Sequence, residues 1–299
     1  LTGGAGIDAY YLSKDTEKFD YIEQNDALVQ LTKHNFKQLE ANQIHTHTMT
    51  AEKFINNISD HYDFIYLDPS RRDTNKRKVF LFADCEPNIV SMKNALMQRA
   101  DKVIVKASPL VDIKQGIQEL IGVEEIHVVA VENDCKELLF VLSNNGVISP
   151  RIVCANYKKE IWEHYKFELE EEESASVNYA MPQAFLYEPN ASILKAGAFK
   201  TVASHFNLNK LHPNSHLYTS TERIENFPGR VFEIERILKY DKKIIAEALP
   251  QNKANIACRN FPDSVEQIRK KTKIKEGGDH YLFATTNMEN ENIIILTKK

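Results

Sequence analysis

The sequence has few cysteines, and their spacing suggests neither a disulfide framework nor a metal site. The 299 residues contain four cysteines, widely separated, at Cys85, Cys135, Cys154 and Cys258. There is no CxxC pair, and no histidine pair stands at metal-ligand spacing. We therefore expect free thiols in a reducing compartment, the cytoplasm, and no zinc or other metal site.

Long apolar runs and an excess of positive charge are also missing. No stretch of about 18 apolar residues occurs, so we expect no membrane-spanning segment and no membrane partner. The formal net charge of −4 excludes a global positive field that attracts nucleic acid, so any nucleic-acid surface must be a local patch. With 42% apolar and 27% charged residues, the chain is typical of globular proteins and long enough for two or three domains.

A glycine-rich stretch opens the sequence. The first eight residues read LTGGAGID, with three glycines in four positions between apolar residues and an acid at the end. Glycine lets the backbone adopt positive φ angles and approach a ligand closely. Such loops usually follow a buried parallel strand and open a helix in cofactor-binding folds, although many tight turns share this composition. Neither a strand nor an initiator methionine precedes the loop, so we interpret the first strand as cut away.

An acid follows the next predicted strand. Residues 19–23 (FDYIE) have a strand pattern, and Glu23 lies fifteen residues beyond Asp8. In doubly wound folds an acid at this place hydrogen-bonds a ribose diol. The alternative is a solvated strand-end carboxylate, but the preceding glycine loop favours the ribose. Farther on, Ala51 and Glu52 fit either the border of an adenine ring or a helix start stabilised by an early acid.

A second acid ends an apolar run at residues 64–67 (FIYL). The predicted strand must stop at Asp68-Pro69, because proline cannot donate a hydrogen bond to a sheet. Asp68 should therefore lie at the carboxyl end of a central strand, where open α/β sheets bind ligands. Arg71 and Arg72 follow, and arginine suits the recognition of phosphate or carboxylate groups. The alternative is an ordinary turn with solvated arginines.

The motifs LTGGAGID, YIEQND and FIYLDPSRRD, in this order and spacing, resemble class I S-adenosylmethionine-dependent methyltransferases. More narrowly, the whole chain resembles a bacterial family with a small ferredoxin-like domain and a C-terminal THUMP-like domain. The resemblance implies an α/β fold, in which a Rossmann-like methyltransferase sheet with a truncated first strand precedes two small α+β modules. We place the methyltransferase domain at residues 1–149, the ferredoxin-like domain at 150–224 and the THUMP-like domain at 225–299.

The resemblance also implies roles for individual residues. The glycines would approach the methionine part of S-adenosylmethionine, Glu23 would bind its ribose, and Ala51-Glu52 would border its adenine. The full set implied to bind the cofactor is Thr2, Gly3, Gly4, Gly6, Asp8, Glu23, Gln24, Ala51 and Glu52. The set implied at the methyl-transfer site is Asp68, Pro69, Arg71 and Arg72.

Two departures from better understood relatives narrow the expected reaction. Enzymes that methylate an exocyclic amine carry a second proline and a base-stacking aromatic residue where this chain has Ser70 and Arg71. Enzymes that methylate a uracil carbon need a cysteine at the end of the next strand, where this chain reads KASP at residues 106–109. Covalent catalysis through cysteine is therefore not expected. We expect direct transfer to a nitrogen or oxygen, with Asp68 orienting or deprotonating the acceptor.

The C-terminal part is locally basic inside an acidic protein. From residue 225 the pattern predicts strand, helix, strand, helix and two strands, with basic residues at Arg259, Arg269, Lys270, Lys271, Lys273 and Lys275. Basic helices often bind phosphate backbones, but a lysine-rich helix end also complements the helix dipole. The likeness to a THUMP-like RNA-binding domain favours RNA as a partner. The acidic run at residues 168–173 is interpreted as a solvated strand end or linker.

The leading hypothesis from the sequence is a methyltransferase that uses S-adenosylmethionine to modify RNA. One alternative is an enzyme of the same class with a protein or small-molecule acceptor, which the net acidity and the missing aromatic residue support. Another is a non-catalytic RNA-binding protein that keeps the fold but not the reaction.

Overall fold

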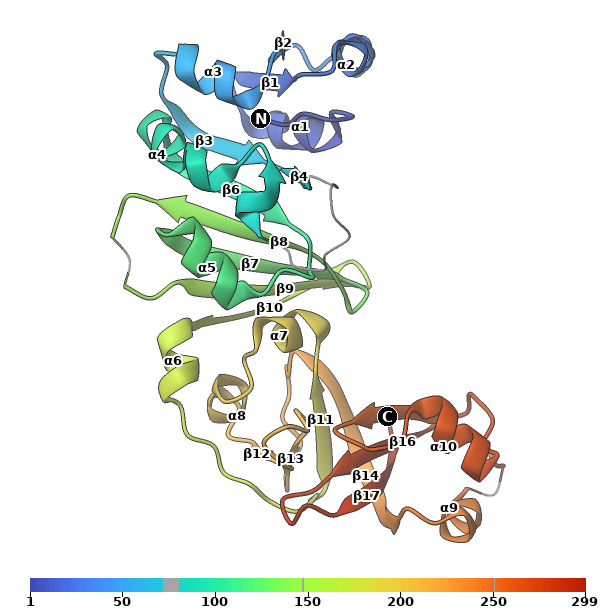
Figure 1. Cartoon of the computed structure of the whole chain (residues 1–299). Helices are drawn as coiled ribbons and strands as arrows, with labels where there is room; N and C mark the ends of the chain where they lie inside the picture. The colour runs from blue at the N-terminus through green and yellow to red at the C-terminus, as the bar shows by residue number, and fades with distance from the viewer. Residues whose placement is uncertain (72–80, 147, 250) are drawn as a thin grey trace. The chain divides into compact units, whose positions relative to one another are not determined.

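The computed structural model describes residues 1–71, 81–146, 148–249 and 251–299 (Figure 1). The chain divides into two compact units. Unit 1 comprises residues 1–130 and 135–153, and unit 2 comprises residues 131–134 and 154–299. Within the described ranges, no helix has both the length and the apolar character needed to cross a membrane.

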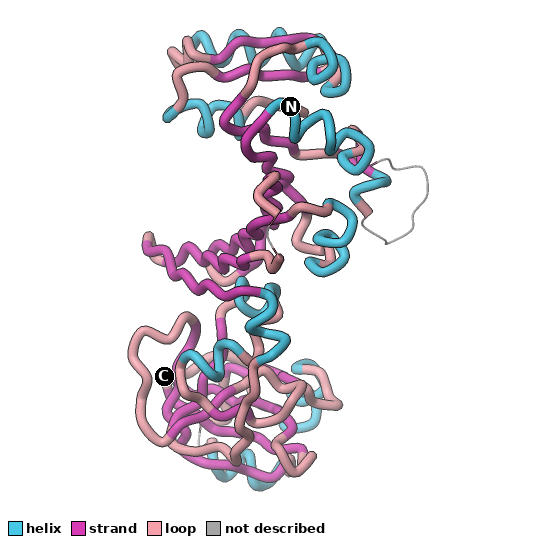
Figure 2. The backbone as a smooth tube through the Cα atoms, turned by 90° about the vertical axis from the view of Figure 1, so that its left-hand side faces the viewer, coloured by secondary structure: helices cyan, strands magenta, loops and turns pink. Residues whose placement is uncertain are grey.

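Unit 1 alternates helices with strands, and its helices lie against the strands (Figure 2). Its helical elements are α1 (Ile7–Leu12), η1 (Ser13–Asp15), α2 (Asp26–Gln38), α3 (Ala51–Asn57), η2 (Phe82–Asp84), α4 (Ile89–Arg99) and α5 (Ile113–Leu120). Its strands are β1 (Phe19–Glu23), β2 (Ile44–Thr48), β3 (Tyr62–Leu67), β4 (Ser70–Arg71), β5 (Cys85–Glu86), β6 (Ala100–Ala107), β7 (Val123–Val131) and β8 (Asp134–Ser143). The strand β9 (Arg151–Lys158) begins in unit 1 and continues into unit 2.

Local sequence accounts for the first elements. The side chain of Asn25 caps α2 by accepting a hydrogen bond from the Leu28 amide, and the helix buries one face through Val29 and Phe36. That face packs against the buried Tyr21 of β1. β3 ends at Leu67, directly before Asp68-Pro69, as the sequence predicts.

Parallel pairing places several strand ends at the same edge. β1 pairs in parallel with β2, and β3 pairs in parallel with β6. β6 then pairs antiparallel with β8, whose other neighbour is β7. Because the carboxyl ends of parallel strands lie side by side, the residues that follow β3 and β6 are brought together.

Unit 2 is built on a seven-stranded sheet in the order β12-β13-β11-β14-β17-β16-β15. Its remaining strands are β10 (Ile161–Glu168), β11 (Phe185–Pro189), β12 (Asn209–Lys210), β13 (Tyr218–Ser220), β14 (Gly229–Lys239), β15 (Asn255–Arg259), β16 (His280–Thr286) and β17 (Asn292–Lys298). Its helices are α6 (Leu169–Ser174), α7 (Ala191–Ala196), α8 (Thr201–His205), α9 (Lys242–Ala248) and α10 (Val265–Thr272).

This sheet is buried on both faces. Along β17, Ile294 and Leu296 join a core that includes residues of α9 and α10, whereas Ile293 and Ile295 join a second core. The continuous apolar run of β17 follows from this double burial, because alternate side chains point to opposite faces.

The structure corrects the interpretation of the acidic run at residues 168–173. Most of it forms α6, which opens with a capping box between Glu168 and Glu171. The carboxylate of Glu172 then accepts hydrogen bonds from the amides of Phe199, Lys200 and Thr201, at distances of 2.8 to 3.1 Å. The run thus begins at the end of β10, as the sequence predicts, but it continues as a helix, and one of its acids binds the amides that precede and open α8.

Candidate active site

The glycine loop runs between the ends of β1 and β3. The Gly3 amide donates to the Ile22 carbonyl at 2.7 Å, and the Leu1 nitrogen donates to the Tyr66 carbonyl at 2.8 Å. Gly6 then begins α1, since the Tyr10 amide donates to its carbonyl at 2.9 Å. The loop is therefore anchored to both strands and opens a helix, as the sequence predicts.

Each glycine of the loop has its own structural reason. A Cβ atom on Gly3 would lie 2.1 Å from the ring of Tyr21. One on Gly6 would lie 2.7 Å from the ring of Phe36, and Gly6 also has a φ of 77°. Gly4, with a φ of 53°, has no neighbouring heavy atom within 4 Å of such a Cβ among the described residues. Gly3 and Gly6 thus permit close packing, whereas the side of Gly4 on which a Cβ would stand faces open space.

Glu23 is bound to the loop. One carboxylate oxygen accepts from the Gly4 amide at 2.9 Å, and the other accepts from the Asn25 amide at 2.8 Å. The Glu23 carbonyl also accepts from the Met49 amide at 3.1 Å, which brings the chain before α3 to the same strand end. At the start of that helix Ala51 is buried and Glu52 is half-buried, while Gln24 is exposed.

Asp68 is connected to the same loop from the other side. Its amide donates to the Thr2 hydroxyl at 2.9 Å. Its carboxylate accepts from the Lys106 ammonium at 2.8 Å, and that ammonium also contacts Asp8 at 2.7 Å. Tyr66 donates its hydroxyl to Asp8 at 2.7 Å. The loop therefore joins Glu23 to a second group of polar side chains, Asp8, Tyr66, Asp68 and Lys106, which we call the Lys106 cluster.

Burial and hydrogen bonding act against each other in the Lys106 cluster. Burial disfavours the Lys106 ammonium, but the hydrogen bonds to Asp68 and Asp8 prevail and raise its pKa above the ordinary value. For Asp8, burial is likewise outweighed, and the hydrogen bonds from Lys106 and Tyr66 lower its pKa. Burial and the bond to Asp8 raise the pKa of Tyr66. At neutral pH the cluster therefore contains a charged lysine and a tyrosine that remains a hydrogen-bond donor.

The whole chain is similar to a solved structure. It aligns with the crystal structure of a "putative methyltransferase" from Porphyromonas gingivalis W83, with 35% identity and a TM-score of 0.90. The alignment covers 100% of this chain and 76% of the other. Family models match residues 185–228 as a ferredoxin-like domain and residues 229–299 as THUMP domain-like. Among proteins with curated functions, none matches the sequence.

The chain belongs to the methyltransferase family with ferredoxin-like and C-terminal THUMP-like domains. This confirms the α/β class and the two small modules that the sequence predicts. In this methyltransferase, Glu23 and Asp68 lie at the carboxyl ends of strands from two parallel pairs, on either side of the glycine loop.

The structure describes the backbone of only one of the two predicted arginines. Arg71 lies in β4, where its backbone pairs with Cys85 of β5, and Arg72 lies outside the described residues. Pro69 is half-buried directly after Asp68. The described contacts bring Asp68 into the cluster, and the side chains of both predicted arginines lie outside the part of the chain that the structure describes.

Lys106 and Tyr66 are members of the cluster that sequence reasoning missed. The register between β3 and β6 aligns Leu67 with Val105, so the next residues, Asp68 and Lys106, are neighbours. The sequence offers one signal for Lys106, because this charged residue directly follows the apolar run at residues 103–105.

The predicted basic residues of the THUMP-like region divide into two groups. Arg259 forms an ion pair with Glu188 at 2.6 Å, Arg269 donates to backbone carbonyls, and Lys271 pairs with Asp263 at 2.6 Å. The second group is exposed and, within the described chain, makes no side-chain hydrogen bond or ion pair: Lys270, Lys273 and Lys275. A positive patch in this module therefore depends mainly on the second group. The described residues contain no group of three or more side chains placed to hold a metal ion.

Proposed function

We propose that this methyltransferase uses S-adenosylmethionine as its methyl donor and modifies RNA at a nitrogen or oxygen, without a cysteine intermediate. The observation that carries the proposal is the shared glycine loop, which binds Glu23 through the Gly4 amide and Asp68 through the Thr2 hydroxyl. A cofactor on this loop has one carboxylate on each side. We further propose that residues 1–149 form the catalytic domain.

The residues of the loop fit such a cofactor. The open backbone at Gly4 permits close approach of a ligand. Glu23 accepts two amide hydrogen bonds and retains further acceptor positions, which suits a ribose diol. Ala51, small and buried at the start of α3, suits the border of a flat ring. When bound, S-adenosylmethionine supplies a methyl group that is activated by its positively charged sulfur.

Asp68 is the residue that would contact the acceptor. Its side chain is 46% exposed, so a substrate can reach it, whereas the side chain of Lys106 is only 20% exposed. The Asp68 carboxylate would accept a hydrogen bond from the acceptor N–H or O–H group and orient the attacking lone pair. It would also accept the proton that the acceptor loses. Lys106, bound to both Asp8 and Asp68, would hold the carboxylate in place.

The RNA acceptor is supported by unit 2. Residues 229–299 match a THUMP domain-like model, and the exposed Lys270, Lys273 and Lys275 all lie in this region. Exposed lysines that make no internal ion pair are available to phosphate groups.

The first test is calorimetric titration with S-adenosylmethionine. Wild type should bind at micromolar concentration, and Glu23→Ala should weaken binding by about 1–3 kcal/mol, since polar groups of the cofactor lose their partner. No binding at millimolar cofactor would refute the donor. The second test is transfer of a radioactive methyl group to cellular extracts. A methylated product that ribonuclease degrades would support RNA as the acceptor. A methylated product found only on protein or on small molecules would refute RNA as the acceptor.

A further inference from the structure

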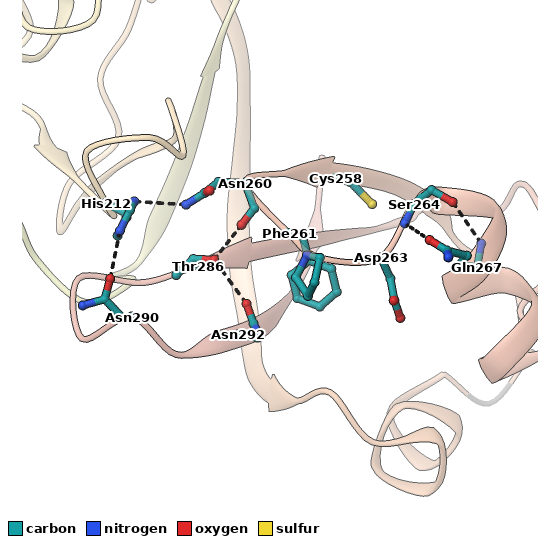
Figure 3. Close-up of a pocket in the computed structure, with 11 residues that line it drawn as sticks. His212, Cys258, Asn260, Phe261, Asp263, Ser264, Gln267, Thr286, Asn290 and Asn292 are labelled. Atoms are coloured by element: carbon teal, nitrogen blue, oxygen red, sulfur yellow. Dashed lines mark hydrogen bonds between the residues drawn. The ribbon is translucent and has the colours of Figure 1, made fainter.

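A concave site lies in unit 2, and it shares no residue with the proposed methyl-transfer site. It has a volume of about 820 Å³. It is lined by the segment from Cys258 to Gln267, by Thr286, Asn290 and Asn292 of the β16–β17 hairpin, and by His212 (Figure 3). We infer that this pocket binds one base of a single-stranded RNA. The inference rests on the proposed RNA acceptor and assigns the recognition of that RNA to named residues.

His212 fixes the orientation of two amide side chains. Its Nδ1 atom accepts from the Asn214 amide at 3.1 Å and from the side-chain nitrogen of Asn260 at 3.0 Å. Its Nε2 atom lies 3.2 Å from Oδ1 of Asn290, to which it donates. Since both amides use one end on His212, Asn290 keeps its NH₂ group and Asn260 keeps its carbonyl oxygen for other partners.

The backbone supports this arrangement. Asn260 and Asn290 have φ angles of 53° and 62°, a left-handed conformation that asparagine tolerates better than most residues. The turn that carries Asn290 is held by Asn287, whose side-chain oxygen accepts from the amides of Glu289 and Glu291 at 3.0 and 2.9 Å. His212 therefore fixes a side-chain donor on Asn290 and a side-chain acceptor on Asn260 among the residues that line the pocket, and an edge of a nucleobase complements groups of this kind.

Aromatic packing and charge also favour a base. The ring of Phe261 lies edge-on against Tyr240, with centroids 5.1 Å apart, and is itself only half-buried. Asp263, the one acid among the lining residues, accepts from Lys271 and from the Tyr240 hydroxyl, each at 2.6 Å. Its charge is therefore already paired. An aromatic ring beside neutral amides suits a stacked base better than a free anion or cation.

Groups suited to the phosphates of the same strand lie on the adjoining helix. The N-terminal cap of α10, Ser264, lines the pocket, and the exposed Lys270 and Lys273 lie in the last turn of α10 and directly after it. At 1.5 Å per residue, Lys273 lies about 13 Å along the helix from Ser264. One module thus combines a neutral pocket for a base with ammonium groups for the backbone.

The test is fluorescence anisotropy with four labelled single-stranded RNA homopolymers, of A, C, G and U. Wild type should prefer one base. Phe261→Leu and Asn290→Gly, the latter tolerant of a positive φ, should each weaken binding of the preferred oligomer roughly tenfold and remove the preference. Neither should change the slope of log affinity against log salt concentration. The double variant Lys270→Ala, Lys273→Ala should weaken all four oligomers alike and reduce that slope.

Met288→Ala, in the same hairpin turn but outside the pocket, is the matched control and should bind as wild type does. Urea denaturation establishes that each variant is folded. If folded Phe261→Leu and Asn290→Gly both retain wild-type affinity and preference, the pocket does not bind a base, although RNA stands as the partner. If wild type binds none of the four oligomers, the inference is refuted, while the methyl-transfer assay with cellular extracts still decides the RNA acceptor and calorimetry with S-adenosylmethionine still decides the methyl donor.

Discussion

The Nζ atom of Lys106 lies 2.8 Å from Oδ2 of Asp68 and 2.7 Å from Oδ2 of Asp8. A single ammonium group therefore connects the ends of β3 and β6 with the first turn of α1, the helix that the glycine loop opens. A change at Lys106 therefore alters its contacts with both Asp68 and Asp8.

Removing the charge at Lys106 should impair methyl transfer more than cofactor binding. We expect Lys106→Met to reduce the transfer rate by about 100-fold, because Asp68 loses the group that positions it. Affinity for S-adenosylmethionine should stay within a few-fold. Asp68→Ala should abolish transfer with the same small effect on affinity, and Lys106→Arg should keep part of the rate. Wild-type turnover in Lys106→Met or Asp68→Ala would remove that residue from the site.

The stability contributed by Asp8 should depend on pH. Its folded-state pKa lies below the ordinary 3.8, so its interactions stabilise the fold above about pH 4 and are lost as the pH falls through the folded-state pKa. The effect should be below about 1 kcal/mol, because the side chain is 43% exposed. Urea denaturation of wild type and Asp8→Asn at pH 7 and pH 3 measures it. A stability difference that is equal at both values would contradict the prediction.

The packing of Gly3 against Tyr21 gives a prediction about stability. Gly3→Ala should destabilise the protein by about 1–3 kcal/mol, because the new Cβ overlaps a buried ring. Gly4→Ala, which meets no neighbour but has a φ of 53°, should cost about 1 kcal/mol. In a Tyr21→Leu background the cost of Gly3→Ala should shrink. An equal cost in both backgrounds, measured by urea denaturation, would show that the ring is not the cause.

Unit 2 contains both a buried and an exposed ion pair, and the buried one is formed by the carboxylate of Glu188. Its side chain is 3% exposed and pairs with Arg230 and Arg259. Arg230→Met should destabilise the protein by about 2–3 kcal/mol, because a buried charge loses one of its partners. Lys271→Met removes a pair whose lysine side chain is 60% exposed and should cost less than about 1 kcal/mol. If thermal unfolding shows that the two variants lose the same stability, burial is not the deciding factor.

The sequence predicts much of the fold, because its signals are local. The helix that the glycine loop opens and the stop at Asp68-Pro69 each appear where short-range chemistry places them. The site is predicted only in part. Lys106 joins it through the register of two strands that are far apart in the chain, and neither strand alone reveals that register.

Two other residues show why pattern reading falls short. The composition of the loop predicts that its glycines let a ligand approach, but the structure shows that Gly3 also makes room for Tyr21, a long-range contact. Glu172 belongs to an acidic run whose pattern favours a solvated segment. Its bonds to the amides of residues 199–201 depend on how the chain folds back between α6 and α8.

The seven-stranded sheet of unit 2 limits how gene segments that encode its two modules can recombine. The ferredoxin-like match ends at residue 228 and the THUMP-like match begins at 229, yet β11 and β14 pair across that division and share one core. A gene fusion that moved residues 229–299 alone would leave β14 with an unpaired edge and an uncovered apolar face, both of which promote aggregation. Recombination between genes should therefore transfer residues 185–299 as one unit.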